Sequence, residues 1–188
     1  MTTTALRPRL VAAIFLSLGL LAGAGSVAAS PAWLDQTAEL PPDPGDAGRA
    51  TLAGVDANDN GVRDDLERHI AQHFGDDPRV RRAVANAVIA TQQGILATDD
   101  DDSRAAQAML LHVGDCMGAI GPVLAPYGDA LWRLRRLIDD TPERRQALEA
   151  HMARVMRMDE IVRKEQGWGE RCERRVDEVV GGVVRRRR

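Results

Sequence analysis

The chain has 188 residues, of which 28 are acidic and 25 are basic, so its formal net charge is −3. This balance argues against general nucleic-acid binding, which needs a basic face. Lys164 is the only lysine, and the other basic residues are arginines. Together with abundant alanine, this indicates a bias towards GC-rich codons. An individual arginine therefore carries little functional weight by itself.

The first 29 residues have the pattern of a signal peptide. Arg7 and Arg9 form a basic start, residues 10–21 are an apolar run, and small residues follow at 26–29. We expect cleavage near residues 28–30, which lowers the net charge to −5 because two arginines and no acid are removed. The exported protein would then be periplasmic or secreted.

An uncleaved membrane anchor is the alternative, because no charged residue lies between Arg9 and Asp35. The second half of that stretch is rich in Gly, Ala and Ser, which are only weakly apolar and favour the cleaved form. No cysteine lies near the apolar run, which argues against a lipoprotein.

Residues 30–54 read as a flexible linker, because Pro31, Pro41, Pro42, Pro44 and Gly45 interrupt regular structure. Residues 55–182 are predicted to form one helical domain, which opens with the loop 56–67. Residues 183–188 form a basic tail.

The predicted fold is all-α, a bundle of five or six helices, because apolar residues recur at helical spacing and no strand-like alternation stands out. Caps and breakers mark several boundaries: Asp77-Pro78 and Thr141-Pro142 open helices, and Gly75 closes one. Expected helices start near residues 64, 78, 103, 130, 142 and 170. The fifth runs past Val162, with Met152 and Met156 as core residues.

The two cysteines, Cys116 and Cys172, are expected to form a disulfide in an exported protein. By the chain-entropy argument, a link closing residues 117–171 stabilises a fold by about 3–4 kcal/mol. Two free buried thiols are the alternative.

The segment Asp56–Glu67 has the spacing of a complete calcium loop, D-x-[DN]-x-[DN]-G-x5-E. Calcium prefers six to eight oxygen ligands, which alternate residues of a curled loop supply. Gly61 permits the turn around the ion. The expected ligands are the side chains of Asp56, Asn58, Asn60, Asp64 and Glu67 and the backbone carbonyl of Val62.

On these residues the segment 54–74 resembles the EF-hand family, in a reduced bacterial form with one loop and its exit helix. It is also similar to exported bacterial proteins that carry such a segment before a helical region. Residues 41–53 do not provide a good entering helix, Arg63 stands at loop position eight where an apolar residue is usual, and there is no sister loop. The resemblance therefore implies a weak structural site, with a Kd of roughly 10⁻⁴–10⁻³ M, rather than a sensor.

Two further pairs have metal-ligand spacing, His69 with His73 and His112 with Cys116. Pairs at i, i+4 can bind zinc, but neither has a recognisable third ligand, so both are expected to be ordinary surface or core residues. The tail Arg185–Arg188 is expected to be a solvated end, with contact to anionic lipid as the alternative.

The sequence contains no familiar catalytic motif, neither G-x-S-x-G, H-E-x-x-H nor a phosphate-binding glycine loop. We therefore expect an exported binding or accessory protein of the cell envelope, with an unidentified protein or envelope component as partner. An envelope enzyme or enzyme inhibitor with an unfamiliar site is the alternative. The sequence does not indicate the oligomeric state.

Overall fold

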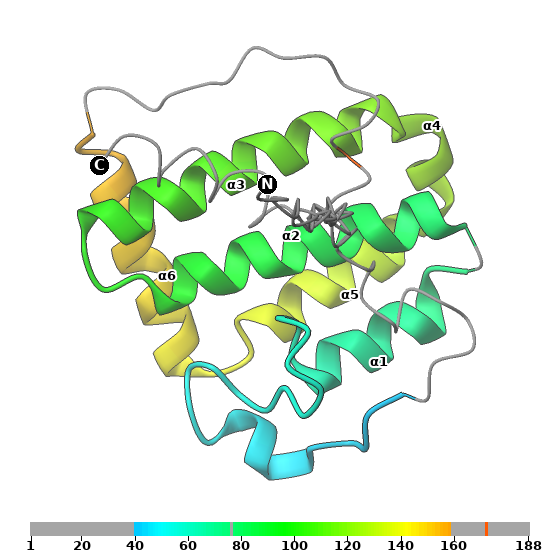
Figure 1. Ribbon diagram of the computed structural model, residues 1–188, viewed down its shortest axis with the longest axis horizontal. Helices are drawn as coiled ribbons and strands as arrows, with labels where there is room; N and C mark the ends of the chain where they lie inside the picture. Colours follow the sequence, from blue (N-terminus) through cyan, green and yellow to red (C-terminus); the bar gives the residue numbers. More distant parts are fainter. Residues whose placement is uncertain (1–39, 76, 159–171, 173–188) are drawn as a thin grey trace, which may run out of the picture.

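Helices form all the regular structure among residues 40–75, 77–158 and 172, which the computed structural model describes (Figure 1). The all-α prediction is confirmed. The elements in chain order are η2 (Gly45–Arg49), α1 (Asp64–His73), α2 (Pro78–Leu96), α3 (Asp100–Ala119), α4 (Gly121–Leu124), η3 (Ala125–Tyr127), α5 (Gly128–Ile138) and α6 (Pro142–Val155).

Helix α2 is the centre of the bundle, because it contacts α1, α3, α5 and α6. Most of its apolar side chains are fully buried, among them Val80, Val84 and Val88. The expected stripe of α1 also faces this core, since Leu66, Ile70 and Phe74 have no exposed surface. Burial of each such side chain contributes about 1.5–3 kcal/mol, so the packing around α2 is a major source of stability in the bundle.

The capping signals in the sequence mark real helix ends. The Asp77 carboxylate accepts a hydrogen bond from the backbone N–H of Arg79 at 2.9 Å, and the Thr141 hydroxyl accepts one from Arg144 at 3.2 Å. Gly75 follows α1 with φ +61°, a conformation that favours glycine. These three predictions are confirmed.

Other boundaries differ from the prediction. α3 begins at Asp100 rather than near Ser103, because Asp99 caps it by accepting from the N–H of Asp102. α6 ends at Val155, before the expected Val162, and i→i+3 hydrogen bonds close its last turn. The prediction for α6 also misassigned its faces: Met152 is 43% and Met156 82% exposed.

α2 continues through a glycine, Gly94, to Leu96. Gly94 is buried, and a Cβ at this position would lie 3.0 Å from Cδ2 of His151. Glycine here allows α2 and α6 to approach each other. His151 is itself fully buried, and neither ring nitrogen has a hydrogen-bond partner among the described residues.

Residues 40–54, which the sequence analysis assigned to a flexible linker, pack on the helical domain. Pro41 and Gly48 are buried, and the Pro41 carbonyl accepts a 2.8 Å hydrogen bond from Arg68 of α1. The described residues do not include the predicted signal peptide, residues 30–39, the predicted last helix apart from Cys172, or the tail 183–188.

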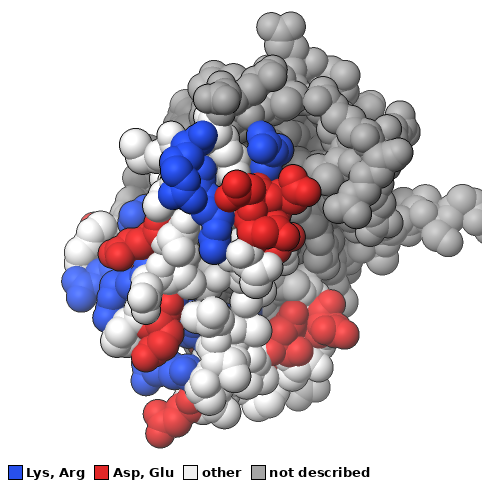
Figure 2. All heavy atoms as spheres, turned by 90° about the vertical axis from the view of Figure 1, so that its left-hand side faces the viewer, with Lys and Arg blue, Asp and Glu red and all other residues white. Residues whose placement is uncertain are grey.

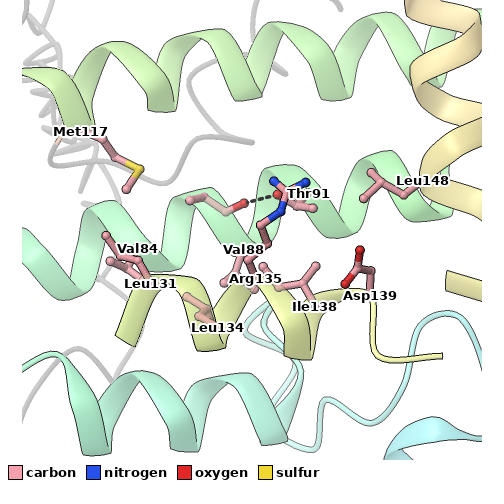
Figure 3. A pocket seen from close by; sticks show the side chains of 11 residues that line it. Val84, Val88, Thr91, Met117, Leu131, Leu134, Arg135, Ile138, Asp139 and Leu148 are labelled. Carbon is pink, nitrogen blue, oxygen red and sulfur yellow. Dashed lines mark hydrogen bonds between the residues drawn. The ribbon is translucent and has the colours of Figure 1, made fainter. Parts of the chain in front are cut away.

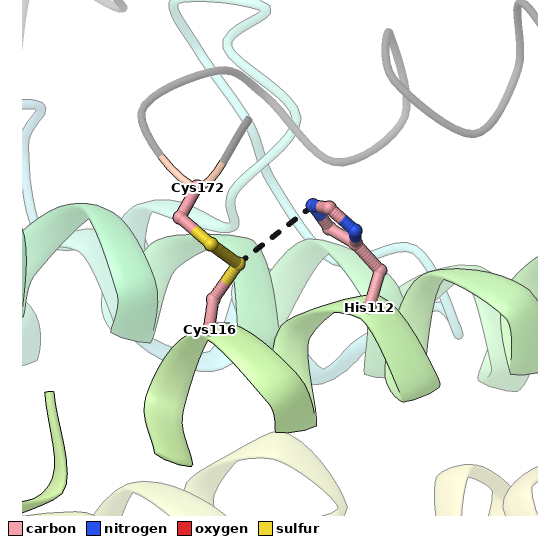
Figure 4. Close-up of a disulfide and its surroundings, with 3 residues drawn as sticks. All are labelled: His112, Cys116 and Cys172. Carbon is pink, nitrogen blue, oxygen red and sulfur yellow. Dashed lines mark hydrogen bonds between the residues drawn. A yellow bond between two sulfur atoms is a disulfide. The ribbon is translucent and has the colours of Figure 1, made fainter. Parts of the chain in front are cut away.

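Cys116 and Cys172 are joined in a disulfide, with their Cα atoms 5.6 Å apart (Figure 4). The predicted pairing is confirmed. Cys116 lies on α3, so the link attaches the chain beyond α6 to the outer helix of the bundle.

Charges of both signs alternate on the face in Figure 2, and no broad basic area covers its described part. Within the described ranges no single helix is long and apolar enough to cross a membrane. The pair formed by α3 and Gly121–Ile138 would suffice by length and composition alone, with a bend of 84°.

Replacing Gly94 by alanine tests the close approach of α2 and α6. We expect Gly94→Ala to lower the free energy of unfolding by about 1–2 kcal/mol, because crowding against a buried ring outweighs the gain in helix propensity. The measurement is urea unfolding followed by circular dichroism. Gly114→Ala on α3 is the matched control: its Cβ would meet nothing within 4 Å, so it should stabilise the protein. Equal effects of the two changes would contradict the packing role of Gly94.

The buried imidazole of His151 should make folding sensitive to acid. Burial, reinforced by the charge of Arg154, lowers the pKa of His151, so the folded state favours the neutral ring. Stability is therefore complete above the ordinary histidine pKa of about 6.5 and is lost as the pH falls towards the lower folded-state pKa.

Urea unfolding between about pH 5 and pH 8 should show that His151→Leu flattens this dependence. The control His73→Gln changes an exposed histidine and should keep the pH dependence of the wild type. Part of the pH dependence will remain in His151→Leu, because burial also lowers the pKa of His69. A slope in His151→Leu equal to that of the wild type would exclude His151 as its source.

Candidate functional site

The predicted calcium loop lies between the docked segment 40–54 and α1, and the helix begins inside it at position nine. Asp64 and Glu67 therefore sit in the first turn of α1, where the helix dipole favours negative charge. Gly61 has φ +85° and Asp59 has φ +58°, so the backbone reverses direction at the expected place.

The side chains of the loop hold its turns in place. The Asp56 carboxylate accepts hydrogen bonds from the backbone N–H groups of Asn60 and Gly61, at 3.1 and 2.8 Å. The Asn60 side-chain oxygen accepts from the N–H of Val62 at 2.9 Å. Asp and Asn favour such local bonds, and here they curl the segment around its own polar groups.

Glu67 is the centre toward which the loop converges. Its carboxylate has no exposed surface and accepts hydrogen bonds from the amides of Asn58 and Asn60, at 3.2 and 3.0 Å. Burial raises the pKa of Glu67; the two amide hydrogen bonds oppose this rise, and the charges of Asp64 and Asp56 add to it. Asp64 and Asp56 thus act on Glu67 as like charges, which a cation would neutralise. Among the described residues, however, Asp56, Asp64 and Glu67 do not form a group whose carboxylate oxygens all lie within 4.8 Å of one another.

Asp64 adds a buried oxygen that needs a partner. Its Oδ1 accepts a 2.9 Å hydrogen bond from the N–H of Ala57, but its Oδ2 is buried and has no hydrogen-bond partner within the described residues. An unsatisfied buried oxygen is costly, and a metal ion would satisfy it. The carboxylates of Asp56, Asp64 and Glu67 offer hard oxygens, which calcium prefers. Asn58 and Asn60 present their amide nitrogens to Glu67, so both amides would have to turn to offer oxygens to an ion. Val62 is buried, and carbonyl ligation by this residue stays a prediction.

Arg63, at loop position eight, attaches the loop to the helices. Its backbone N–H donates to the side chain of Gln92 on α2 at 3.3 Å. Its guanidinium, on a side chain only 1% exposed, donates to the carbonyls of Leu137 and Ile138, at 2.9 and 3.0 Å, and pairs with Asp65 at 2.6 Å. In paired EF-hands this position contacts a sister loop. In this chain it contacts α2 and the end of α5.

A second buried arginine, Arg144 of α6, holds the segment before the loop. It has no exposed surface, and it donates to the carbonyls of Gly48, Leu52 and Thr51 at 2.6, 3.2 and 2.8 Å. Its guanidinium also binds Asp140 at 2.6 Å.

Asp140 lies between the two buried arginines. It is 3.7 Å from Arg63 and also binds the exposed Arg49 at 3.0 Å. Burial opposes ionisation of Asp140, but hydrogen bonds from Arg144 and Arg49 and the charge of Arg63 outweigh it and hold its pKa below the usual range. We call Arg63, Asp140 and Arg144 the arginine cluster.

The arginine cluster was not predicted from the sequence. Arg63 stands out there only as a departure from the EF-hand pattern, and a single arginine carries little weight in a chain that contains so many. The only local signal was the position of Arg144 in the first turn of a capped helix.

The two predicted zinc-type pairs have different surroundings. The rings of His69 and His73 lie 4.4 Å apart, and Nε2 of His69 is 3.4 Å from the carbonyl oxygen of Ala130. No third metal-ligating side chain joins them among the described residues. His112 and Cys116 do gain a third member, because Cys172 is brought beside them.

A groove of about 240 Å³ lies between α2, α5 and α6, near the end of α3 (Figure 3). Its lining is mainly apolar, with Thr91, Arg135 and Asp139 as the polar members; the apolar members are Val84, Ala87, Val88, Met117, Leu131, Leu134, Ile138 and Leu148. Histidine is absent from this lining, and the groove does not include the calcium-loop residues.

Comparison of the chain with protein-family models, with curated proteins and with solved structures gives no match.

Removing the Arg144 guanidinium should release residues 48–54 from the domain. We expect Arg144→Met to lower the free energy of unfolding by about 3–5 kcal/mol, because Asp140 loses a buried partner and three carbonyls lose their donor. Urea unfolding measures the loss, and amide hydrogen exchange should show faster exchange in residues 48–54. Arg145→Met is the control, since Arg145 is exposed and its guanidinium donates to the carbonyl of Asp139, outside the segment 48–54. Unchanged exchange in Arg144→Met would show that the segment is held by other contacts.

Proposed function

We propose that the loop Asp56–Glu67 binds one calcium ion, which stabilises a small exported helical protein. The observation that carries this proposal is the buried Asp64 oxygen that has no hydrogen-bond partner within the described residues, together with the buried Glu67 carboxylate, on which the charges of Asp64 and Asp56 act. Asp56, Asn58, Asn60, Asp64 and Glu67 would supply side-chain oxygens and Val62 its carbonyl. Bound calcium would neutralise charge that the fold otherwise buries at a cost.

The role of the ion is structural in this proposal. A sensor needs a loop whose filling changes the packing of its helices, usually together with a sister loop. The loop here is attached through Arg63 to backbone carbonyls at the end of α5, so it has little freedom to shift relative to the helices when an ion binds. An ion at this place would fix the start of α1 to the bundle.

The proposed site of action is outside the cytoplasm, in the periplasm or beyond the cell. The signal-peptide pattern and the disulfide support this, since disulfides persist in oxidising compartments. A mature mass that matches cleavage near residues 28–30 would support export without an anchor, and an intact N-terminus would favour the membrane-attached form.

The molecular work would be the binding of another protein or an envelope component. The mainly apolar groove favours binding over catalysis at that place, because its lining lacks a histidine that could join Asp139 in acid–base chemistry. Recovery of a co-purifying partner with and without calcium tests this role. A hydrolytic activity on peptidoglycan or peptides would favour the alternative of an enzyme.

Calcium should raise the free energy of unfolding of the purified mature protein. With a Kd of roughly 10⁻⁴–10⁻³ M, about 10 mM calcium should add about 1–3 kcal/mol relative to chelator. Urea unfolding in calcium, in magnesium at the same concentration and in chelator measures the effect. Magnesium should do less, because it prefers a rigid octahedral site and keeps its waters.

Glu67→Gln should abolish this calcium response, since the variant loses the carboxylate that would clamp the ion. Asp59→Asn is the matched control: Asp59 is an exposed loop acid at position four, outside the ligand set, and asparagine tolerates its positive φ. A full calcium response in Glu67→Gln, or its loss in Asp59→Asn, would refute the proposed ligands.

A further inference from the structure

The disulfide has a histidine beside it. His112 and Cys116 lie one turn apart on α3, and Nε2 of His112 is 3.7 Å from the Sγ of Cys116 (Figure 4). The potential ligand atoms of His112, Cys116 and Cys172 all lie within 4.8 Å of one another. Cys116 is buried, and the other two residues are half-buried.

These distances are close to those of a zinc site. With Zn–S bonds of about 2.3 Å and Zn–N bonds of about 2.0 Å, tetrahedral geometry places a sulfur and a nitrogen ligand about 3.5 Å apart and two sulfurs about 3.8 Å apart. The 3.7 Å spacing of His112 and Cys116 is already close to the first value. The two sulfurs must separate, and the Cys172 sulfur must take its position beside His112; rotation of the cysteine side chains provides this movement once the covalent bond is broken.

We propose that reduction of the Cys116–Cys172 disulfide creates a zinc site formed by His112, Cys116 and Cys172. In the oxidised protein the sulfurs are bonded to each other and cannot act as thiolate ligands. The same two cysteines therefore either cross-link the chain or hold a metal ion, and the redox state selects between the two.

The chemistry balances with a dithiol as reductant. The dithiol supplies two electrons and two protons, the S–S bond breaks into two thiols, and the reductant leaves as its own disulfide. Zinc then displaces one proton from each thiol to solvent and binds the neutral imidazole of His112. Two thiolates balance the charge of the ion, and water fills the fourth position.

Zinc would act as a second link between α3 and the chain around Cys172. Since the metal binds only the reduced form, it should stabilise that form and slow re-formation of the disulfide. The site is independent of the calcium loop, because the loop supplies no residue to it.

The experiment uses the full mature chain, reduced anaerobically with a phosphine that is then removed. Zinc binding is measured by competition with a chromogenic chelator, and Co²⁺ is used as a spectroscopic probe because thiolate ligation gives strong charge-transfer absorption. We expect one equivalent of metal in the reduced protein and thiolate absorption with Co²⁺. The oxidised protein should give no such absorption. Zinc should also slow re-oxidation by a low-molecular-weight disulfide.

His112→Ala should weaken zinc binding to the reduced protein by about 10-fold or more, since even loss of a group that supports a ligand often costs that much. The control is His73→Ala, which removes the competing pair on α1 and should leave the affinity of the cysteine site unchanged. The double variant Cys116→Ser with Cys172→Ser should give no thiolate absorption.

Equal affinities of the reduced wild type and His112→Ala would overturn the proposal and leave His112 as a neighbour of the disulfide. Absence of thiolate–Co²⁺ absorption in the reduced protein would also overturn it. Circular dichroism provides the remaining check: loss of the helical signal on reduction, not restored by zinc, would show that the three ligands do not stay together.

Discussion

The buried guanidinium groups of Arg63 and Arg144 connect residues 48–65 to the end of α5 and the start of α6. Arg63 and Arg144 are among the largest fully buried side chains, and Asp140 lies between them. Burying such charges is tolerated only when nearly every donor finds an acceptor, so the partners are constrained in position. The acceptors are backbone carbonyls at residues 48–52 and at the end of α5.

The space between these arginines also constrains the backbone. Gly54 has φ +72°, and a Cβ there would lie 2.7 Å from Cδ of Arg63 and 2.9 Å from a terminal nitrogen of Arg144. Residue 54 must therefore be glycine for the chain to pass between them and enter the loop. The geometry of the proposed calcium site thus depends on contacts made by residues that are not its ligands.

The sequence was sufficient to predict the helical class and many helix ends, because these depend on local chemistry. Asp77 and Thr141 cap helices by bonding N–H groups two or three residues away, and Gly75 ends one through its own backbone freedom. The disulfide was predictable because only two cysteines exist. Hydrogen bonds also link the loop side chains, and each spans fewer than ten residues; calcium ligation by these side chains stays a prediction.

The remaining features depend on long-range contacts that alter the usual preference of a residue. A hydrophobic pattern places arginine and histidine at the surface, yet α6 buries Arg144 and His151 and exposes Met152 and Met156. Gly94 lies inside a helix, where glycine is usually unfavourable, because His151 occupies the space that a side chain would need. The docking of residues 40–54 could not be predicted either. The segment is held through its backbone carbonyls, which accept from arginines of the helices, and every sequence has such carbonyls.

The disulfide divides the chain into a covalently closed part and an open part. The bond between Cys116 and Cys172 closes a covalent ring that contains α4, α5 and α6, whereas the loop, α1 and α2 belong to an open arm. Asp140 and Arg144 are members of the ring, and Arg63 is a member of the arm. The Arg63–Asp140 ion pair and the hydrogen bonds from both buried arginines to backbone carbonyls therefore join two topologically separate parts. If the arm unfolds, the ring stays closed by the disulfide. The backbone carbonyls that accept from Arg63 then remain next to each other in the ring, so the arm can bind to them again when it refolds.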